Sequence, residues 1–244
     1  MASGPWYPVG GDGENIDMEP TIKSEPPARE RYVPALGFRW LTSFYDPLAA
    51  LWLPEDDMRR DLVEQAGLRP GQRVLDIGCG TGTLLGLVIE RCPAALAWGI
   101  DGDRAMLARA RAKLTGAPGH VGLIRGLASD LPFPPASFDR VLTSLVLHHL
   151  TTRTKARTLA AAHALLRPGG ELHVADWGDP QDLPMWLAFQ GVRLLDGRET
   201  TDDNYYGRLP GFMRDAGFTD VRETGRRRTV FGPLVLWSAR RPEA

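Results

Sequence analysis

The segment RVLDIGCGTGTLLGLV, residues 73–88, decides how the rest of the sequence is interpreted. It opens with an apolar run typical of a buried strand, passes through glycines at 78, 80 and 82, and continues with the apolar spacing of a helix. Glycines at alternate positions allow another molecule to approach the backbone closely. The segment therefore predicts a strand, a ligand-binding turn and a helix, in that order.

The rest of the sequence alternates between strand-like and helix-like patterns. Strands are expected at 73–78, 95–101, 120–126, 138–147 and 171–177, and helices at 81–92, 103–116 and 152–170. Beyond Pro210 the order changes to a helix at 211–218 and strands at 219–226 and 228–240, whose short connection requires an antiparallel pair. We therefore predict an α/β fold, a Rossmann-like, seven-stranded, mostly parallel sheet with an antiparallel C-terminal strand pair.

Two different kinds of sequence precede this region. Residues 1–31 are rich in Gly, Pro and Glu without a period, which predicts a disordered extension. Residues 32–69 contain several aromatic residues and then a polar helical stretch, which predicts an N-terminal helical cap packed on the main body.

Composition excludes several classes of protein. The formal net charge of −1 argues against a nucleic-acid partner, and Arg226–Arg228 are expected to form a solvated turn. Cys79 and Cys92 form no spaced set for zinc or disulfides, so no metal site is expected. No apolar run reaches the roughly 18 residues of a membrane span. The N-terminus does not resemble a signal peptide, so a cytoplasmic location is expected.

The glycine turn does not match the common phosphate-binding loops. Thr83 occupies the place of the third glycine of a dinucleotide fingerprint, and the lysine of a P-loop is absent. Asp76 would repel a phosphate and attract an ammonium group. Asp101 lies 19 residues beyond Gly82 at the end of the next strand, where a carboxylate can accept hydrogen bonds from ribose hydroxyls. These features predict a ligand with a ribose and a positive amino group but no phosphate.

Four segments in this order, residues 74–82, 99–111, 131–150 and 165–177, carry a family resemblance. The sequence resembles the class I S-adenosylmethionine-dependent methyltransferases over about residues 40–240, and is similar to the ubiquinone and menaquinone C-methyltransferases. The resemblance implies a methyltransferase domain over residues 32–244. It also implies S-adenosylmethionine as methyl donor, S-adenosylhomocysteine as product and a small-molecule acceptor, and it leaves a homodimer open.

The resemblance also implies which residues bind the cofactor. These are Asp76, Gly78, Cys79, Gly80, Asp101, Gly102, Leu127, Ala128 and Leu145. Leu127 stands where the family usually has a carboxylate that holds adenine. Either backbone and apolar contacts hold the adenine here, or the nearby Asp130 substitutes.

The acceptor side is marked by fewer residues. His148 and His149 follow the fourth strand at the expected pocket edge, and His149 is the candidate general base, with a structural role as the alternative. Asp176, at the end of the fifth strand, and Tyr45, in the aromatic cap, are candidate substrate contacts.

The predicted reaction is methyl transfer to an O, N or C nucleophile of a small organic acceptor. Two alternatives stay open. One is an S-adenosylmethionine-binding enzyme of non-methylating chemistry, of the decarboxylase or cyclase type, and the other is a catalytically silent partner that retains the fold.

Overall fold

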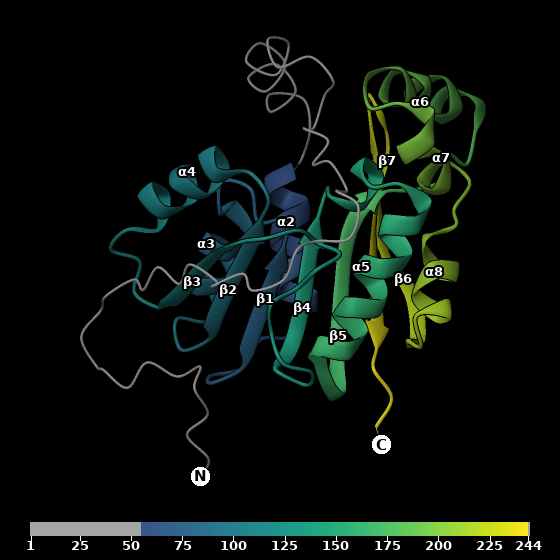
Figure 1. Ribbon diagram of the computed structural model, residues 1–244. Coiled ribbons are helices and arrows are strands. Elements are labelled where there is room, and N and C mark those ends of the chain that lie inside the picture. The colour runs from purple at the N-terminus through teal and green to yellow at the C-terminus, as the bar shows by residue number, and fades with distance from the viewer. Residues whose placement is uncertain (1–54, 244) are drawn as a thin grey trace, which may run out of the picture.

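The computed structural model describes residues 55–243, which build one sheet covered by helices on both faces (Figure 1). The strands are β1 (Arg73–Ile77), β2 (Leu96–Asp101), β3 (His120–Arg125), β4 (Phe138–Ser144), β5 (Leu166–Trp177), β6 (Thr219–Thr229) and β7 (Gly232–Arg240). The helices are α2 (Glu55–Gln65), α3 (Thr83–Arg91), α4 (Arg104–Leu114), the 3₁₀ helix η1 (Leu147–His149), α5 (Thr152–Leu165), α6 (Leu183–Leu195), α7 (Arg198–Tyr205) and α8 (Leu209–Asp215). The extension predicted at 1–31 and most of the predicted cap lie outside the described residues.

The seven strands run in the order β3-β2-β1-β4-β5-β7-β6. β1 to β5 are parallel, and β7 is antiparallel to both of its neighbours. The predicted α/β fold with an antiparallel C-terminal pair is therefore confirmed. The carboxyl ends of β1, β2 and β4 lie at one edge of the sheet, which is where ligands bind in such folds.

Apolar side chains attach the helices to the two faces of the sheet. Helices α2, α3 and α4 share one core cluster, which includes Leu62, Leu85 and Leu107. Helices α5 and α8 share the other, which includes Leu159 and Met213 (Figure 1). Because both faces are covered, four consecutive residues of β1 are buried, and burial does not alternate along the strand.

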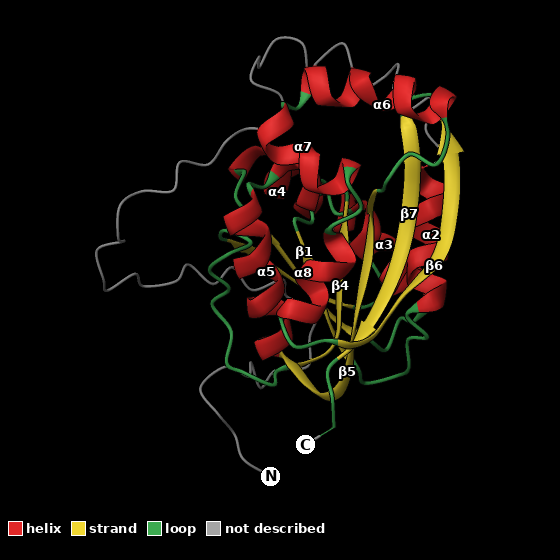
Figure 2. Cartoon of the chain, turned by 90° about the vertical axis from the view of Figure 1, so that its right-hand side faces the viewer, coloured by secondary structure: helices red, strands yellow, loops and turns green. Residues whose placement is uncertain are grey.

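The sequence patterns did not predict α6 and α7, which lie between β5 and α8. Helix α6 begins at the cap residue Asp182, whose carboxylate accepts a hydrogen bond from the Met185 amide at 3.0 Å. It carries apolar residues on its exposed side as well, among them Leu187 and Leu194, and this weakens the amphipathic period. Figure 2 shows α6 and α7 stacked at one end of the molecule, above α5 and α8.

The prediction of a solvated turn at Arg226–Arg228 is wrong, because these residues lie inside β6. Each arginine pairs with a carboxylate that is distant in sequence: Arg226 with Asp179, Arg227 with Asp61 and Arg228 with Asp182. Opposite charges from α2 and from the start of α6 thus hold the strand. The hairpin turns four residues later than Arg226, at Val230 and Phe231.

A buried ion pair anchors α7 to α5. Lys155 of α5 is fully buried, and its Nζ lies 3.2 Å from the Asp203 carboxylate of α7 and also donates to the Thr200 carbonyl. Asp203 further accepts hydrogen bonds from Thr152 at 2.7 Å and Arg208 at 3.2 Å. Burial lowers the pKa of Lys155, and the charge of Asp203 opposes that shift.

No helix among residues 55–243 is both long and apolar enough to cross a membrane. The cytoplasmic location stays a prediction.

Replacing Asp203 with Ala should leave the Lys155 charge buried and unpaired. We expect the free energy of unfolding to fall by about 3–5 kcal/mol, the usual effect of breaking a buried pair. Urea unfolding followed by circular dichroism measures this, with the exposed Asp215→Ala as control. Equal stability of the two variants would contradict the anchoring role.

Candidate functional site

In the glycine turn, the space beside Gly78 is filled by a neighbouring side chain, whereas the space beside Gly80 is empty. Gly78, Gly80 and Gly82 all have positive φ, at 73°, 51° and 75°. A Cβ on Gly78 would lie 2.4 Å from the Val146 side chain, whereas a Cβ on Gly80 would meet nothing within 4 Å. Gly78 is therefore required by packing, and Gly80 leaves the backbone open to a ligand.

Asp101 is fixed against this turn. One carboxylate oxygen accepts a hydrogen bond from the Gly80 amide at 2.8 Å, and the other accepts from the Asp103 amide at 2.8 Å. Asp103 in turn caps α4, because its carboxylate accepts a hydrogen bond from the Ala105 amide at 2.7 Å. Because each carboxylate oxygen has a further lone pair, Asp101 can still accept hydrogen bonds from two hydroxyl groups.

Asp76 is a buried carboxylate below the turn. It is 1% exposed, and its Oδ2 has no hydrogen-bond partner among the described residues. Burial raises the pKa of Asp76 to about 7, with Arg59 opposing the shift and Asp101 adding to it. A buried carboxylate oxygen without a hydrogen-bond partner costs free energy, which a positively charged ligand would offset.

Cys79 belongs to the packing of the turn. It is 6% exposed, and a Cβ on Gly99 would lie 2.8 Å from its Sγ, so the side chain fills the space above β2. Burial and the charge of Asp76 raise the pKa of the thiol, which therefore stays protonated. The side chain is not a nucleophile here.

The residues expected around adenine lie beside Asp101. The Gly126 amide donates to the Asp101 carbonyl at 3.0 Å, and the Asp130 amide donates to the Leu127 carbonyl at 3.0 Å. Leu127 is 37% exposed, while Gly102 and Ala128 are partly buried. The structure thus brings this short turn to the carboxyl ends of β2 and β3.

The residues that follow β4 pack against the glycine turn. Leu145 has φ +57°, which is strained for a residue with a side chain, and its amide donates to the Ala175 carbonyl at 2.8 Å. Val146 then packs on Gly78, and η1 follows directly. Val146 was missed by the sequence patterns, because nothing distinguishes it from other apolar residues.

His148 and Asp176 form a buried pair next to these residues. His148 is 4% exposed and donates from Nδ1 to an Asp176 oxygen at 2.7 Å. Asp176 is 0% exposed and also accepts from the amides of Leu147 and Trp177 and from the Asn204 side chain, at 2.8, 2.7 and 3.2 Å. Burial disfavours both charges, yet their attraction prevails: the pKa of His148 is raised and that of Asp176 is lowered.

His149 and Asp196 complete this group of polar side chains. The His149 side chain is 29% exposed, its ring centroid lies 3.9 Å from that of His148, and its Nδ1 lies 4.0 Å from an Asp196 oxygen. Burial and the neighbouring His148 lower the pKa of His149 to about 3, so its ring is neutral at pH 7. Asp196 was missed because it ends α6, a helix that the sequence patterns did not reveal.

The two predicted substrate contacts are not at an exposed site in the described structure. Tyr45 lies outside the described residues. Asp176 is buried beneath His148.

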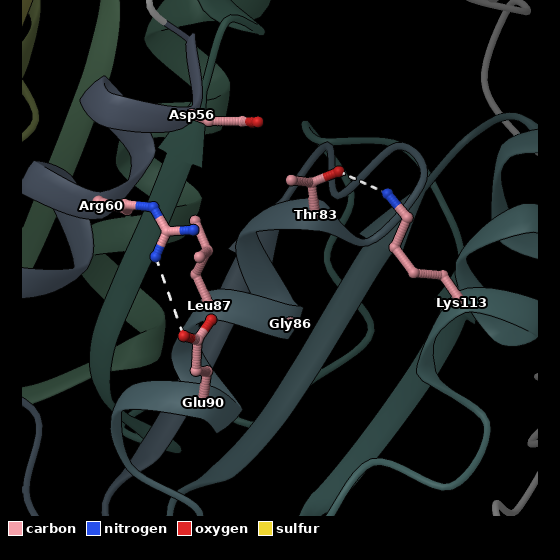
Figure 3. Close-up of a pocket in the computed structure, with 7 residues that line it drawn as sticks. All are labelled: Asp56, Arg60, Thr83, Gly86, Leu87, Glu90 and Lys113. Atoms are coloured by element: carbon pink, nitrogen blue, oxygen red, sulfur yellow. Dashed lines mark hydrogen bonds and ion pairs between the residues drawn. The ribbon is translucent and has the colours of Figure 1, made fainter.

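A cavity of about 280 Å³ opens between α2, α3 and α4, where Lys113 donates to Thr83 at 2.7 Å (Figure 3). None of the predicted site residues lines this cavity.

Comparison with known proteins agrees with this arrangement. Residues 74–170 match the family model described as "Methyltransferase domain". An uncharacterized methyltransferase of Synechocystis sp. is 29% identical over 187 residues, which cover 76% of this chain and 85% of that protein. The ubiquinone/menaquinone biosynthesis C-methyltransferase UbiE of Vibrio parahaemolyticus is 36% identical over 196 residues, covering 67% of this chain and 71% of that protein.

A solved structure extends the likeness to the fold. The S-adenosylmethionine-dependent methyltransferase SibL, in its apo form, superimposes with a TM-score of 0.67 at 24% identity, over 82% of this chain and 58% of that chain. The family model and the sequence identities lead to one group, and the fold is consistent with it. The chain belongs to the class I S-adenosylmethionine-dependent methyltransferases, in the group that contains UbiE.

Proposed function

We propose that this methyltransferase acts on a small organic acceptor and transfers the methyl group to its oxygen, nitrogen or carbon nucleophile. The contact between Gly78 and Val146 carries this proposal. It joins the glycine turn, where the methyl donor binds, to the strand end that bears His148 and His149. An acceptor that contacts these histidines therefore lies beside the methyl donor.

The cofactor half of the site is assigned as follows. Asp101 accepts hydrogen bonds from the ribose hydroxyls, and Asp76 compensates the ammonium charge near the open backbone of Gly80. Leu145 borders the methionine portion. Backbone and apolar contacts from Gly102, Leu127 and Ala128 hold the adenine.

The chemistry requires placement more than activation. The sulfonium of S-adenosylmethionine is already an electrophile, and aligning a nucleophile with the methyl carbon contributes about 7–11 kcal/mol in favourable intramolecular cases. The positive charge on sulfur disappears during transfer, so exclusion of water favours the reaction. We assign His149, the more exposed of the two histidines, to contact with the acceptor, and Asp176 to positioning His148.

The non-methylating alternative keeps the same cofactor site and differs in its product. Mass spectrometry of reactions with a panel of phenols, amines and carbon acids distinguishes the two reactions. Methyl transfer yields S-adenosylhomocysteine in equal amount to methylated acceptor, and a cyclase or decarboxylase leaves the methyl donor intact. Intact cofactor residues argue against a silent partner.

Replacing Asp101 with Ala should weaken S-adenosylmethionine binding at least about tenfold, because hydrogen bonds from the ribose to a charged group are lost. Titration calorimetry measures the Kd, with Asp215→Ala as control and NAD as a ligand that should not bind. An unchanged Kd in a folded variant would remove Asp101 from the site.

Cofactor affinity should depend on pH through Asp76. The ammonium group favours the carboxylate, so we expect affinity to fall by up to about tenfold per pH unit below pH 7. In the described part of the chain, the charged groups that act on Asp76 are Arg59 of α2 and Asp101 of β2. Calorimetry between pH 5.5 and 8, about 1.5 units below and 1 unit above the pKa, should show this slope in the wild type and a flat profile in Asp76→Asn.

For the protein without ligand, the free energy of unfolding should fall as the pH rises, opposite to the trend in cofactor affinity. Folding raises the pKa of Asp76 from 3.8 to about 7. The contribution of this group to the free energy of unfolding is therefore fully present below pH 4 and is lost as the pH rises through 7. Urea unfolding should therefore find Asp76→Asn more stable than the wild type at pH 8, and the gap should close near pH 4. A gap independent of pH would contradict ionisation of Asp76 as its cause.

Replacing His149 with Ala should leave cofactor affinity nearly unchanged and reduce turnover at least about tenfold, since the acceptor loses a positioning contact. Calorimetry gives the first quantity, and formation of S-adenosylhomocysteine with the best acceptor of the panel gives the second. His120→Ala, at an exposed histidine on β3, is the control. Equal turnover would show that His149 is structural.

A further inference from the structure

We infer that His148, His149 and Asp196 form a binding site for one divalent transition-metal ion at the end of β4. The three side chains present one ligand atom each, and these atoms all lie within 4.8 Å of one another. The sequence patterns indicated no metal site, because the third ligand comes from α6.

The separations are longer than direct hydrogen bonds and leave room for an ion between the groups. Nε2 of His148 lies 3.8 Å from one Asp196 oxygen, and Nδ1 of His149 lies 4.0 Å from the other. Both distances exceed the hydrogen-bonding range. Metal–ligand bonds are about 2.0–2.2 Å, so two of them span roughly 3.4 Å at a tetrahedral angle and 4.2 Å in line. The ligand atoms lie up to 4.8 Å apart, so they must move closer by up to about 1.4 Å to surround one ion at tetrahedral angles.

His148, the more buried of the two histidines, is already oriented as a ligand. Its Nδ1 is held by the Asp176 carboxylate at 2.7 Å, which leaves Nε2 facing Asp196. Carboxylate–histidine–metal arrangements of this kind fix the ring and raise the basicity of the coordinating nitrogen. Asp176 is itself fixed by the Leu147 and Trp177 amides, so the outer shell of the site is built into the fold.

The donor set indicates the class of ion. Two imidazoles and one carboxylate suit Zn²⁺, Co²⁺ and related ions, whereas Mg²⁺ and Ca²⁺ prefer oxygen ligands. Three protein ligands leave a coordination position for water or a substrate atom, as in catalytic zinc sites. The His149 and Asp196 side chains are 29% and 12% exposed, so that position is reached from their side.

The ion would also select the acceptor, a consequence that rests on the proposed function. Two neutral imidazoles and one carboxylate leave a divalent ion with a net positive charge, which favours an oxygen anion. The acceptor class is then a phenol or enol. Its O–H proton passes to solvent, its oxygen forms the bond to the methyl carbon, and the C–S bond breaks with its electron pair on sulfur.

Metal titration of the full chain tests the site without any acceptor. After treatment with a chelator and its removal, Zn²⁺ should bind at one equivalent in calorimetry, and Co²⁺ should give visible absorption bands of a low-symmetry site. His149→Ala and Asp196→Asn should each weaken binding at least about tenfold. His120→Ala and Asp215→Asn should not, and circular dichroism checks that all four variants fold.

Three outcomes overturn parts of the inference separately. No saturable binding of either ion, or equal binding by the His149 and Asp196 variants, overturns the metal site and leaves these groups as a polar cluster. Metal binding without an effect of Zn²⁺ on transfer to phenols overturns the acceptor class alone. Failure of S-adenosylmethionine to bind, measured without metal, overturns the proposed function and not the metal site.

Discussion

The carboxylate of Asp176 joins the elements that position His148 and His149. It accepts hydrogen bonds from two residues of η1, from the next residue of its own strand and from Asn204 of α7. Hydrogen bonds to a charged group contribute about 1.5–3 kcal/mol each, and a carboxylate that is 0% exposed needs several of them. The position of the histidines is therefore set by the charge requirements of one residue that lies below them.

The cofactor side follows a different physical rule. Asp101 accepts hydrogen bonds from protein amides without any ligand, whereas Asp76 is buried with an oxygen that has no partner among residues 55–243. The first residue is an organised acceptor, and the second stores unfavourable free energy that a cation relieves. Packing of Val146 on Gly78 then fixes the distance between this half and the histidines.

Local patterns predicted the parts of the protein that depend on neighbours in sequence. The order of the strands, the glycine turn and the position of Asp101 follow from short-range periodicity or spacing, although β5 begins at Leu166, inside the predicted helix 152–170. Burial of Asp176 did not, because β5 is covered on both faces at its end and its sequence gives no alternation that marks a rim. Asp196 and the partners of Arg226–Arg228 come from distant segments, and only tertiary contacts reveal them.

The segment between β5 and α8 contributes to the surroundings of the two histidines as one continuous stretch. Residues 178–208 supply Asp196 to the histidines and Asn204 to the carboxylate below them, while the glycine turn and Asp101 come from elsewhere. Exchange of this one segment would remove Asp196 and Asn204 from the surroundings of the histidines and leave the glycine turn and Asp101 untouched. The surroundings of the two histidines can therefore be altered by replacing a contiguous stretch of chain.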